Sequence, residues 1–396
     1  MIRKMSRYTL EELCEIITDG THQTPEYCET GGYLFLSSKD VTSKKIDWEH
    51  AKHIPFELHE KLYERLKPQK NDILLAKNGT TGVAALVDRD EVFDIYVSLA
   101  LLRPKSTVLP QYLFYAINSP VCKRQFDSGL KGIGVPNLHL SVIRKTEINI
   151  PSSEQQRIIC IQLDKLTRII DYRTQQLQAL DDLVKARFVE MFGDPVHNTK
   201  RLPSLPMTEV CDIIDGDRGK NYPKQEEFFD KEYCLFLNAK NVTNHGFDFS
   251  ECMFISKEKD SALRKGKLQR GDIVLTTRGT LGNLAFYTDE VPYENVRINS
   301  GMVILRMNRG IIDEGFFIEQ FRMLVDNIKE SIASGTAQPQ LPISTMNKIK
   351  IVMPDMELQR RFTSFTTEIG RSKVYIKKAL DETQMLFDSL MQEYFG

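Results

Sequence analysis

The sequence lacks long runs of hydrophobic residues and paired cysteine motifs. No stretch approaches the roughly 18 uninterrupted apolar residues that a membrane-spanning helix needs, and no apolar run of signal-peptide length follows the basic start of the chain. We therefore expect a cytoplasmic protein with no membrane partner. The seven cysteines include no Cys-x-x-Cys pair, and the seven histidines show no metal-ligand spacing. This pattern argues against a disulfide framework and predicts no metal site.

The sequence also lacks the motifs of common catalytic sites. It contains no Gly-x4-Gly-Lys-Ser/Thr phosphate loop, no His-Glu-x-x-His zinc motif and no Gly-x-Ser-x-Gly nucleophile elbow. It has no Asn/Asp-Pro-Pro-Tyr/Phe segment of the kind that amino-methyltransferases use to hold the target amine. The glycines at 129–134 lack the spacing of a dinucleotide-binding loop and fit a structural loop better. We predict a non-catalytic protein that binds no cofactor of its own.

The sequence has no excess of charge of either sign. Lysine and arginine together number 53, aspartate and glutamate 54, and the formal net charge is −1. A protein that holds nucleic acid by itself usually carries a basic excess, because cations must neutralise the phosphates. The balance predicts that DNA binding would need basic residues gathered on one face, or a partner that shares the phosphates. We favour the partner.

The sequence does contain a duplication, in which residues 196–396 repeat residues 1–195 in diverged form. Three blocks recur in the same order, namely 13–17 with 210–214, 34–42 with 235–243, and 71–82 with 271–282. Both copies close on Phe-Gly, at Phe192-Gly193 and Phe395-Gly396. A period this long indicates a duplicated domain and not a solenoid repeat. Two similar but non-identical copies suit a target with two different halves.

Each copy begins with short β-type runs that Gly, Pro, Asn and Asp interrupt, and ends with a long helical segment. The runs are 33–36, 72–76, 83–87, 96–102 and 147–150 in the first copy, and 233–237, 272–276, 283–287, 301–306 and 350–352 in the second. Shorter helices are expected at 109–118 and 313–331. The predicted organisation is therefore α+β, with β-rich globular domains at 1–150 and 196–352 and helical segments at 151–195 and 353–396.

The helical segments carry apolar side chains at alternating spacings of four and three residues, which is the heptad pattern of a coiled coil. They are Ile159, Leu163, Leu166, Ile170, Leu177, Leu180, Val184 and Met191 in the first segment, and Phe362, Ile369, Ile376, Leu380, Phe387, Leu390 and Tyr394 in the second. Arg173, Arg187 and Lys373 fill polar positions of these stripes, and we expect Arg173 and Lys373 to set the register. Because a globular domain intervenes and the chain must fold back, we predict that the two helices pair antiparallel.

The most specific local element is a strand followed by a polar turn with two glycines three residues apart. The turn reads Lys-Asn-Gly-Thr-Thr-Gly at 77–82 and Thr-Arg-Gly-Thr-Leu-Gly at 277–282. The glycines permit a sharp turn, and the polar residues that differ between the copies are able to meet phosphates or base edges. The alternative is a hairpin turn whose polar side chains face water. With the polar residues of the second repeated block, the candidate DNA-contacting residues are Ser37, Ser38, Lys39, Lys77, Asn78, Thr80, Asn238, Lys240, Thr277, Arg278 and Thr280.

Four features together resemble the specificity subunits of type I restriction–modification systems. They are the Gly-Asp-Ile-x-Leu strand with its Gly-x-x-Gly turn at 271–282, the Gly-Thr-Ala-Gln-Pro-Gln-Leu segment at 335–341, the helix starts at 148–157 and 351–360, and the closing Phe-Gly pairs. The first copy departs from the pattern, because Asn71 replaces the first glycine and 132–138 reads Gly-Ile-Gly-Val-Pro-Asn-Leu. The resemblance covers essentially the whole chain, and the order of the motifs, twice over, makes it specific.

The resemblance implies two target-recognition domains joined by an antiparallel pair of helices, with an internal pseudo-two-fold duplication. It implies a DNA-sequence reader that recognises a bipartite, asymmetric site in double-stranded DNA. The expected partners are two methyltransferase subunits and the restriction or translocase subunits, and S-adenosylmethionine and ATP would bind those partners. Two other functions remain open at this point: a coiled-coil scaffold or reader in another multi-subunit DNA-modification system, and a DNA-modifying enzyme with an unrecognised site.

Overall fold

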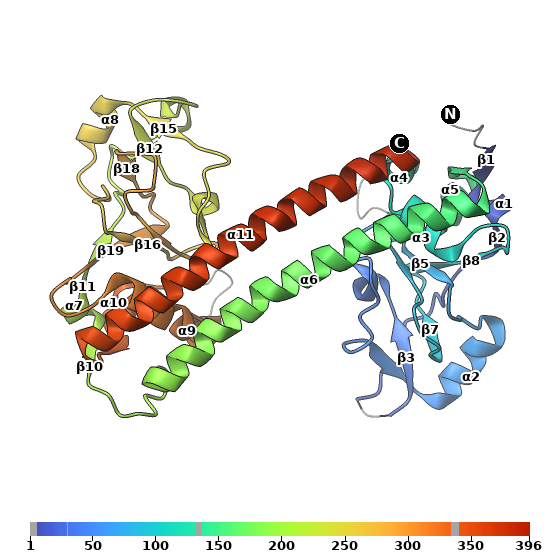
Figure 1. The fold of residues 1–396 in the computed structure, drawn as a ribbon, viewed down its shortest axis with the longest axis horizontal. Coiled ribbons are helices and arrows are strands. Elements are labelled where there is room, and N and C mark those ends of the chain that lie inside the picture. Colours follow the sequence, from blue (N-terminus) through green and yellow to red (C-terminus); the bar gives the residue numbers. More distant parts are fainter. Residues whose placement is uncertain (1–5, 30, 131–136, 334–339) are drawn as a thin grey trace. The chain divides into compact units, whose positions relative to one another are not determined.

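The computed structural model describes residues 6–29, 31–130, 137–333 and 340–396, which form two compact units (Figure 1). The first unit runs to Thr174 and adds Lys377–Gly396, and the second consists of Gln175–Ile376. Each unit therefore combines one β-rich copy with parts of both long helices. No helix in the described residues is long and apolar enough to cross a membrane.

The centre of the first unit is a four-stranded antiparallel sheet in the order β2-β8-β5-β6, beside a three-stranded sheet in the order β4-β3-β7. The strands are β1 Ser6–Thr9, β2 Cys14–Asp19, β3 Tyr33–Leu36, β4 Lys52–Ile54, β5 Ile73–Ala76, β6 Ala84–Leu86, β7 Phe93–Ile95, β8 Leu99–Pro104 and β9 Glu147–Ile150. The helices are α1 Leu10–Leu13, η1 Ser38–Val41, α2 Phe56–Arg65, α3 Pro110–Ile117, α4 Pro120–Gly129, α5 Leu140–Lys145 and α6 Ser153–Phe192. Strands β1 and β9 pair with each other and bring the start of the domain beside the start of α6.

The second unit repeats this topology, with sheets β11-β19-β16-β17 and β15-β12-β18. Its strands are β10 Ser204–Pro206, β11 Cys211–Asp215, β12 Cys234–Phe236, β13 Val242–Thr243, β14 Gly246–Phe247, β15 Phe254–Ile255, β16 Ile273–Thr276, β17 Leu284–Phe286, β18 Val296–Arg297, β19 Met302–Met307 and β20 Lys350–Val352. Its helices are α7 Met207–Val210, η2 Gln225–Glu227, η3 Ala239–Asn241, α8 Lys257–Ala262, α9 Glu314–Ala333, α10 Ile343–Met346 and α11 Met356–Phe395. The identical strand order confirms the duplication that the sequence predicts.

The predicted β-runs agree with the structure, since each overlaps a strand and three of them match β3, β9 and β20 residue for residue. The strand before the glycine turn is apolar throughout because both of its faces are buried. In β5, Ile73 and Leu75 pack with α3 and α4, whereas Leu74 and Ala76 pack with the three-stranded sheet. Successive side chains of a strand point to opposite faces, so a strand between two layers needs an unbroken hydrophobic run.

The repeated Asp of the strand motif has a structural role in both units. Asp72 is buried and accepts two hydrogen bonds from Arg103, at 2.8 and 2.7 Å, and one from the backbone of Gln69. Asp272 makes the same contacts with Arg306 and Gln269. A buried carboxylate needs such partners, because burial without them is costly. The ion pair fixes the start of the strand that leads to the glycine turn.

An Asp-Gly pair recurs in the two copies, at Asp19-Gly20 and Asp215-Gly216, and close backbone contacts explain its glycine. A Cβ atom on Gly20 would lie 1.8 Å from the carbonyl oxygen of Ile95, and one on Gly216 would lie 2.3 Å from that of Asn299. Only glycine fits where one backbone segment lies directly on another. These contacts bring the loop after β2 or β11 against the segment before β8 or β19, at the edge where the glycine turn lies.

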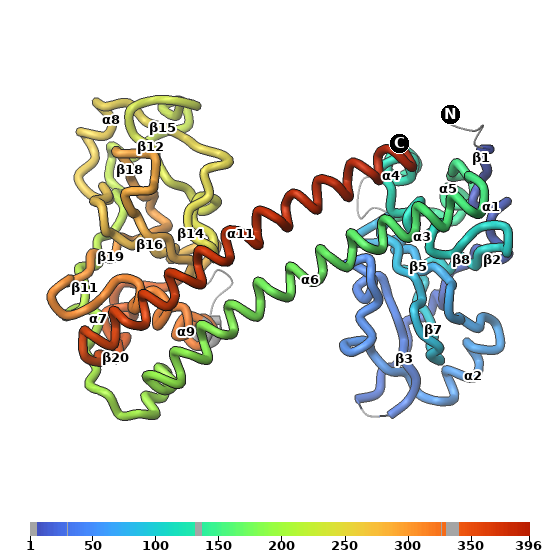
Figure 2. Tube along the Cα trace, viewed as in Figure 1, coloured from blue at the N-terminus to red at the C-terminus, as the bar shows by residue number. Residues whose placement is uncertain are grey.

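The two long helices run antiparallel within each unit. In the first unit, Tyr394 hydrogen-bonds Gln162 while Arg173 hydrogen-bonds Thr383 and the carbonyl of Ala379, so the numbering falls along one helix as it rises along the other. In the second unit, Lys373 pairs with Asp181. Arg173 and Lys373 occupy polar positions of the predicted stripes, and each of them contacts the other helix. Such contacts are what a register-setting role requires. Figure 2 traces α6 and α11 as continuous helices.

None of the fifteen apolar residues of the two predicted stripes is exposed. Leu163, Val184 and Phe362 are buried, and the others are half-buried: Ile159, Leu166, Ile170, Leu177, Leu180, Met191, Ile369, Ile376, Leu380, Phe387, Leu390 and Tyr394. Half-burial is expected where two helices pack with water on their outer faces.

The ends of the long helices leave the paired stripe and enter the domain cores. Phe192, at the end of α6, packs on Phe316 and Phe362 in the core of the second unit, with ring centroids 5.0 and 5.6 Å apart. Phe395, at the end of α11, packs on Tyr112 in the first unit at 5.2 Å. The repeated closing Phe-Gly therefore anchors each helix end in a domain core.

The helix starts are anchored by glutamine. The side chain of Gln156 is buried, accepts a hydrogen bond from the backbone of Leu109 at 2.9 Å and donates to the carbonyl of Pro151. Gln359 makes the same contacts with Asp313 and Pro354. This contact explains why Gln recurs in the helix-start motif, because it satisfies polar backbone groups where the helix meets its domain.

Candidate nucleic-acid interface

The glycine turn forms an exposed tip at the end of β5 and of β16. Gly79 and Gly82 have φ angles of +76° and +87°, and Gly279 and Gly282 have +71° and +89°. Residues other than glycine rarely adopt this left-handed backbone conformation. A Cβ on Gly282 would also lie 2.5 Å from Val325 of α9. The sequence pattern is thus that of a sharp turn, which leaves Thr80 and Thr280 exposed, whereas Leu281 packs into the core of the second unit.

A second polar element lies beside this tip in both units. It is the short 3₁₀ helix η1 or η3, which begins directly after β3 or β12. Thr280 donates a hydrogen bond to the carbonyl of Ala239 at 3.5 Å, and a Cβ on Gly79 would lie 3.9 Å from the hydroxyl of Ser38. The structure therefore brings together the two candidate blocks of each copy, which are about 40 residues apart in the sequence.

A third segment borders the tip. Asn78 forms an isolated antiparallel bridge with Asn137, and Arg278 forms one with Gln340. The side-chain oxygens of Asn78 and Asn137 are buried and have no hydrogen-bond partner among the described residues. The segments that the resemblance singled out, 132–136 and 335–339, lie outside the described residues.

The candidate residues differ in how exposed their side chains are and in whether those side chains already bond within the protein. Lys39, Thr80, Lys240, Arg278 and Thr280 are exposed, and Ser37, Ser38, Asn78 and Asn238 are half-buried. Ser37 and Asn238 cap the 3₁₀ helices: Ser37 bonds Asp40 through its backbone and its hydroxyl, and Asn238 accepts from the backbone of Lys240 at 2.8 Å. Lys240 also pairs with Glu251 at 2.7 Å.

Two candidates are buried below the tip. The ammonium of Lys77 lies 2.5 Å from the carboxylate of Asp19, and the hydroxyl of Thr277 donates to the carbonyl of Gly301 at 3.0 Å. Burial acts to raise the pKa of Asp19, but the hydrogen bond and charge of Lys77 outweigh it, and the pKa is lowered. In this arrangement Lys77 and Thr277 support the tip from beneath, while Asn78 and Arg278 are the neighbouring residues nearer the surface.

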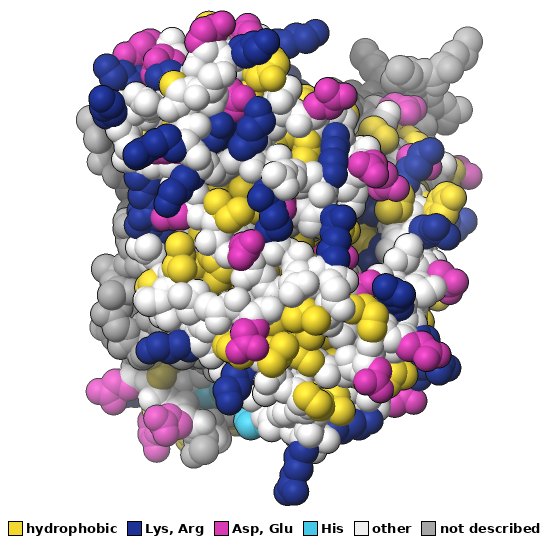
Figure 3. Space-filling model, turned by 90° about the vertical axis from the view of Figure 1, so that its left-hand side faces the viewer, with side chains coloured by type: hydrophobic (Ala, Val, Ile, Leu, Met, Phe, Trp, Pro, Cys, Tyr) yellow, Lys and Arg dark blue, Asp and Glu magenta, His cyan; other side chains and the backbone are white. Residues whose placement is uncertain are grey.

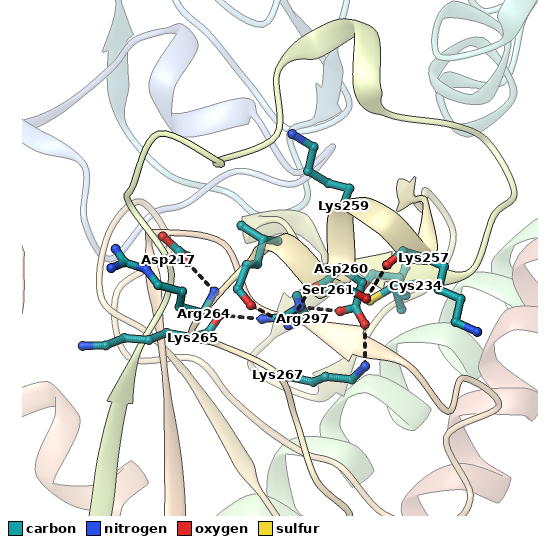
Figure 4. Close-up of polar contacts among 12 residues, drawn as sticks. Asp217, Cys234, Lys257, Lys259, Asp260, Ser261, Arg264, Lys265, Lys267 and Arg297 are labelled. Carbon is teal, nitrogen blue, oxygen red and sulfur yellow. Dashed lines mark hydrogen bonds and ion pairs between the residues drawn. The ribbon is translucent and has the colours of Figure 1, made fainter.

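Sequence reasoning missed a buried polar pair that is inverted between the copies. In the second unit the carboxylate of Asp260 in α8 bonds the guanidinium of Arg297 in β18 (Figure 4). At the matching place in the first unit, His59 of α2 lies 2.7 Å from Asp94 of β7. The carboxylate therefore lies on the helix in the second unit and on the strand in the first. The pattern of residues gave no signal for it, because the partners are 35 and 37 residues apart.

The second unit adds contacts around its pair. Lys267 lies 2.5 Å from the other oxygen of Asp260, and Arg297 also donates to the carbonyls of Asp260, Leu263 and Lys265 at 2.8, 3.1 and 2.7 Å. Burial acts to raise the pKa of Asp260, but hydrogen bonds from Lys267 and Arg297 outweigh it and the pKa is lowered. Arg297 therefore fixes the course of the loop that follows α8.

Neither a disulfide nor a metal cluster accompanies these sites. All seven cysteines lie in the described part of the chain and are free thiols. No group of three or more His, Cys, Asp or Glu residues among the described ones is arranged to hold a metal ion.

Comparison with known proteins identifies the family. The model of the type I restriction modification DNA specificity domain matches residues 3–182 and 205–383. The specificity subunit of the type I restriction enzyme MjaIX of Methanocaldococcus jannaschii is 23% identical over 304 residues, which cover 73% of this chain and 68% of that protein.

Two solved structures have the same fold. The specificity subunit of a type I restriction–modification system from M. genitalium has a TM-score of 0.58 and 17% identity, covering 99% of this chain and 96% of that one. A chain from a structure on complex assembly of the type I restriction–modification system has a TM-score of 0.53 and 16% identity, covering 99% and 98%.

Proposed function

The chain belongs to the family of type I restriction–modification specificity subunits, and from its two recognition tips we propose that it reads a bipartite, asymmetric site in double-stranded DNA. It is the non-catalytic, DNA-recognising subunit of such a system. In this proposal the tip beside Asn78 reads one half of the site, and the tip beside Arg278 reads the other. S-adenosylmethionine and ATP bind the partner subunits, and the complex acts in the cytoplasm.

One observation carries the proposal: the same rigid tip occurs twice with different side chains. The supporting glycines, the buried strand and the neighbouring 3₁₀ helix recur in both units, as do exposed Thr80 and Thr280, whereas Asn78 of the first tip is replaced by exposed Arg278 in the second. Arg recognises guanine through a pair of hydrogen bonds in the major groove, whereas the amide of Asn offers a different set of donors and acceptors. A shared scaffold with different polar residues at its tips is the arrangement expected of two readers with different sequence preferences.

We expect Arg278→Ala to weaken recognition at one half of the site only. A good bidentate contact to guanine is worth about 1–3 kcal/mol, so affinity for the cognate duplex should fall roughly 5- to 150-fold. Binding selection on half-randomised duplexes, with the complex of this chain and its methyltransferase subunits, measures the effect. Asn78→Ala is the matched variant and should affect the opposite half. An unchanged motif and affinity for Arg278→Ala would make it a solvated turn residue.

Exposed apolar residues that recur on both long helices support a partner stoichiometry of two. Tyr172 and Tyr375 occupy equivalent positions and are 63% and 75% exposed, and Leu183 and Leu386 are 46% and 51% exposed. Large apolar side chains gathered on an exposed helix mark protein–protein contacts. In our proposal one methyltransferase subunit binds the helix surface around Tyr172 and a second binds the helix surface around Tyr375. Restriction subunits join that assembly.

We expect Tyr172→Ser and Tyr375→Ser each to remove one methyltransferase subunit, and the double variant to remove both. An exposed tyrosine contributes little to folding, so the chain should remain folded, whereas loss of an aromatic anchor at an interface costs about 2 kcal/mol or more. Native mass spectrometry of the complex gives the stoichiometry directly. Val92→Ser is the control, since Val92 is 41% exposed and lies in the loop before β7, outside both long helices. Unaltered two-to-one assembly in the double variant would refute these surfaces.

A further inference from the structure

The second recognition domain carries a basic cluster that the first one lacks. Arg218 and Lys220 lie in the loop after β11, and Arg264 and Lys265 lie in the loop after α8. All four are exposed. Figure 3 shows Lys and Arg side chains gathered over the upper part of the second unit, at the height of α8 and β18 in Figure 1.

Buried Asp217 joins the two loops. Its carboxylate accepts hydrogen bonds from the backbone of Gly219 and of Arg264, both at 2.8 Å. These backbone hydrogen bonds hold the pKa of Asp217 below its usual value, so the carboxylate stays ionised near neutral pH. A Cβ on Gly219 would lie 3.3 Å from the guanidinium of Arg264, which shows how closely the loops approach.

Arg297 holds the second loop from the other side, through its bond to the carbonyl of Lys265. Figure 4 shows Arg264 and Lys265 extending to one side of this network, and Lys257 extending to the other. The two cations are therefore presented by a fixed loop, so less conformational entropy is lost when they bind a ligand.

The cluster is continuous with the tip. Arg218 donates to the carbonyl of Ser300 at 3.3 Å, and the backbone of Arg278 donates to the carbonyl of the next residue, Gly301, at 3.2 Å. Arg218 and the candidate base reader Arg278 thus flank the same two-residue segment. A duplex read by the tip would pass its sugar–phosphate backbone along the loops on that side.

Most cations of the cluster form no ion pair within the described part of the protein. Arg218 shares its charge with Asp215, at 3.1 Å. Lys220, Arg264 and Lys265 form no ion pair with any residue that the structure describes. Three exposed, unpaired cations on fixed loops are suited to an anionic ligand such as the phosphates of DNA.

The first domain has no equivalent cluster. The repeat places His22 opposite Arg218, Thr24 opposite Lys220, and Glu64 opposite Arg264. Only Arg65, opposite Lys265, is a cation, and it donates to the backbone carbonyl of Asp19. The acquired cations, and not the shared fold, distinguish the two domains here.

We propose that Arg218, Lys220, Arg264 and Lys265 form a DNA phosphate-binding clamp, present on the second recognition domain alone. The clamp rests on the proposed function, since it positions the duplex for the tip of the same domain. It contributes affinity that is independent of sequence, because phosphate contacts fix register without reading bases.

The test is the salt dependence of DNA binding by the complex with methyltransferase subunits. Each phosphate contact contributes about 0.9 to the slope of log K against log salt. Lys220→Ala with Lys265→Ala should lower this slope by about 1.8 and weaken binding to cognate and random duplexes by the same factor. Lys348→Ala, an exposed cation elsewhere in the unit, is the control and should leave the slope unchanged.

The outcomes separate the clamp from the proposed function. An unchanged slope in the double variant, a loss confined to the cognate duplex, or an equal drop for Lys348→Ala would overturn the clamp. Failure of the wild-type complex to prefer any bipartite sequence would overturn the proposed function instead, while the slopes would still report the phosphate contacts. A melting temperature of the double variant equal to that of the wild type confirms that the comparison is between folded proteins.

Discussion

Four residues inserted into α6 after Leu180, with four inserted into α11 after Lys373, should lengthen the gap between the two half-sites by one to two base pairs. Asp181 pairs with Lys373, so these insertions lie opposite each other and extend both helices together. Four residues add about 6 Å of helix, and a base pair rises about 3.4 Å. The half-sites themselves should not change, because the tips are untouched. Methylome sequencing of cells that carry the variant reports both properties at once.

A matched control separates length from mere disturbance. Four residues are close to one helical turn and nearly preserve the apolar stripes, whereas a single inserted residue rotates everything beyond it by about 100°. The one-residue variants should therefore lose helix pairing and methylation. If the four-residue variant is active and its gap is unchanged, the helices do not set the spacing.

Arg297→Met should lower the free energy of unfolding by about 3–5 kcal/mol, because it removes the buried partner of Asp260 and leaves only the partly exposed Lys267. Three carbonyl groups of the loop after α8 also lose their donor. Urea unfolding measures the change. Arg309→Met is the control: Arg309 pairs with Glu314 at the surface and is 64% exposed, so that change should cost no more than about 1 kcal/mol. Equal stability of both variants would show that the buried pair contributes nothing.

The pH dependence of this effect has a defined sign. The pKa of Asp260 is lowered in the folded protein, so its contribution is present above the pKa of an unfolded aspartate, about 3.9, and is lost as the pH falls through the lowered value. The stability difference between wild type and Arg297→Met should therefore be full at pH 7 and shrink in strong acid.

The elements that could be predicted are those with a regular residue period. Strand β5 is recognisable as an unbroken apolar run bounded by turn residues, and α6 and α11 follow from their heptads. The shortest strands could not be found in this way, because β15 and β18 have only two residues each and carry no period. The inverted pair of Asp260 and Arg297 depends on that unpredicted sheet.

The ends of the helices show where the heptad model is wrong. The predicted stripe continues from Val184 through Arg187 to Met191, but the fully buried residues are Phe188 and Phe192. Their spacing of four residues follows the period of a straight helix packing into a domain core, and not the 3.5-residue period of a coiled coil. The sequence does not mark where one kind of packing gives way to the other.

The candidate site was predictable in position but not in the role of each residue. The glycine spacing locates both tips, and the positive φ angles explain it. The burial of Lys77 could not be inferred, because its partner Asp19 lies 58 residues away and the contact exists only in the folded domain. The basic cluster of the second domain was hidden for the same reason, since the chain as a whole is almost neutral.

The role of this chain as the DNA-sequence reader is tested by the methylome of cells that carry it with its methyltransferase subunits, compared with cells in which the chain is deleted. We expect one methylated motif that depends on the chain and consists of two different half-sites separated by a fixed gap. Exchange of the tip residues at 277–280 for those at 77–80 should alter one half of that motif only. A motif that persists without the chain, or a single continuous motif that both tips alter, would show that the two tips do not read separate half-sites.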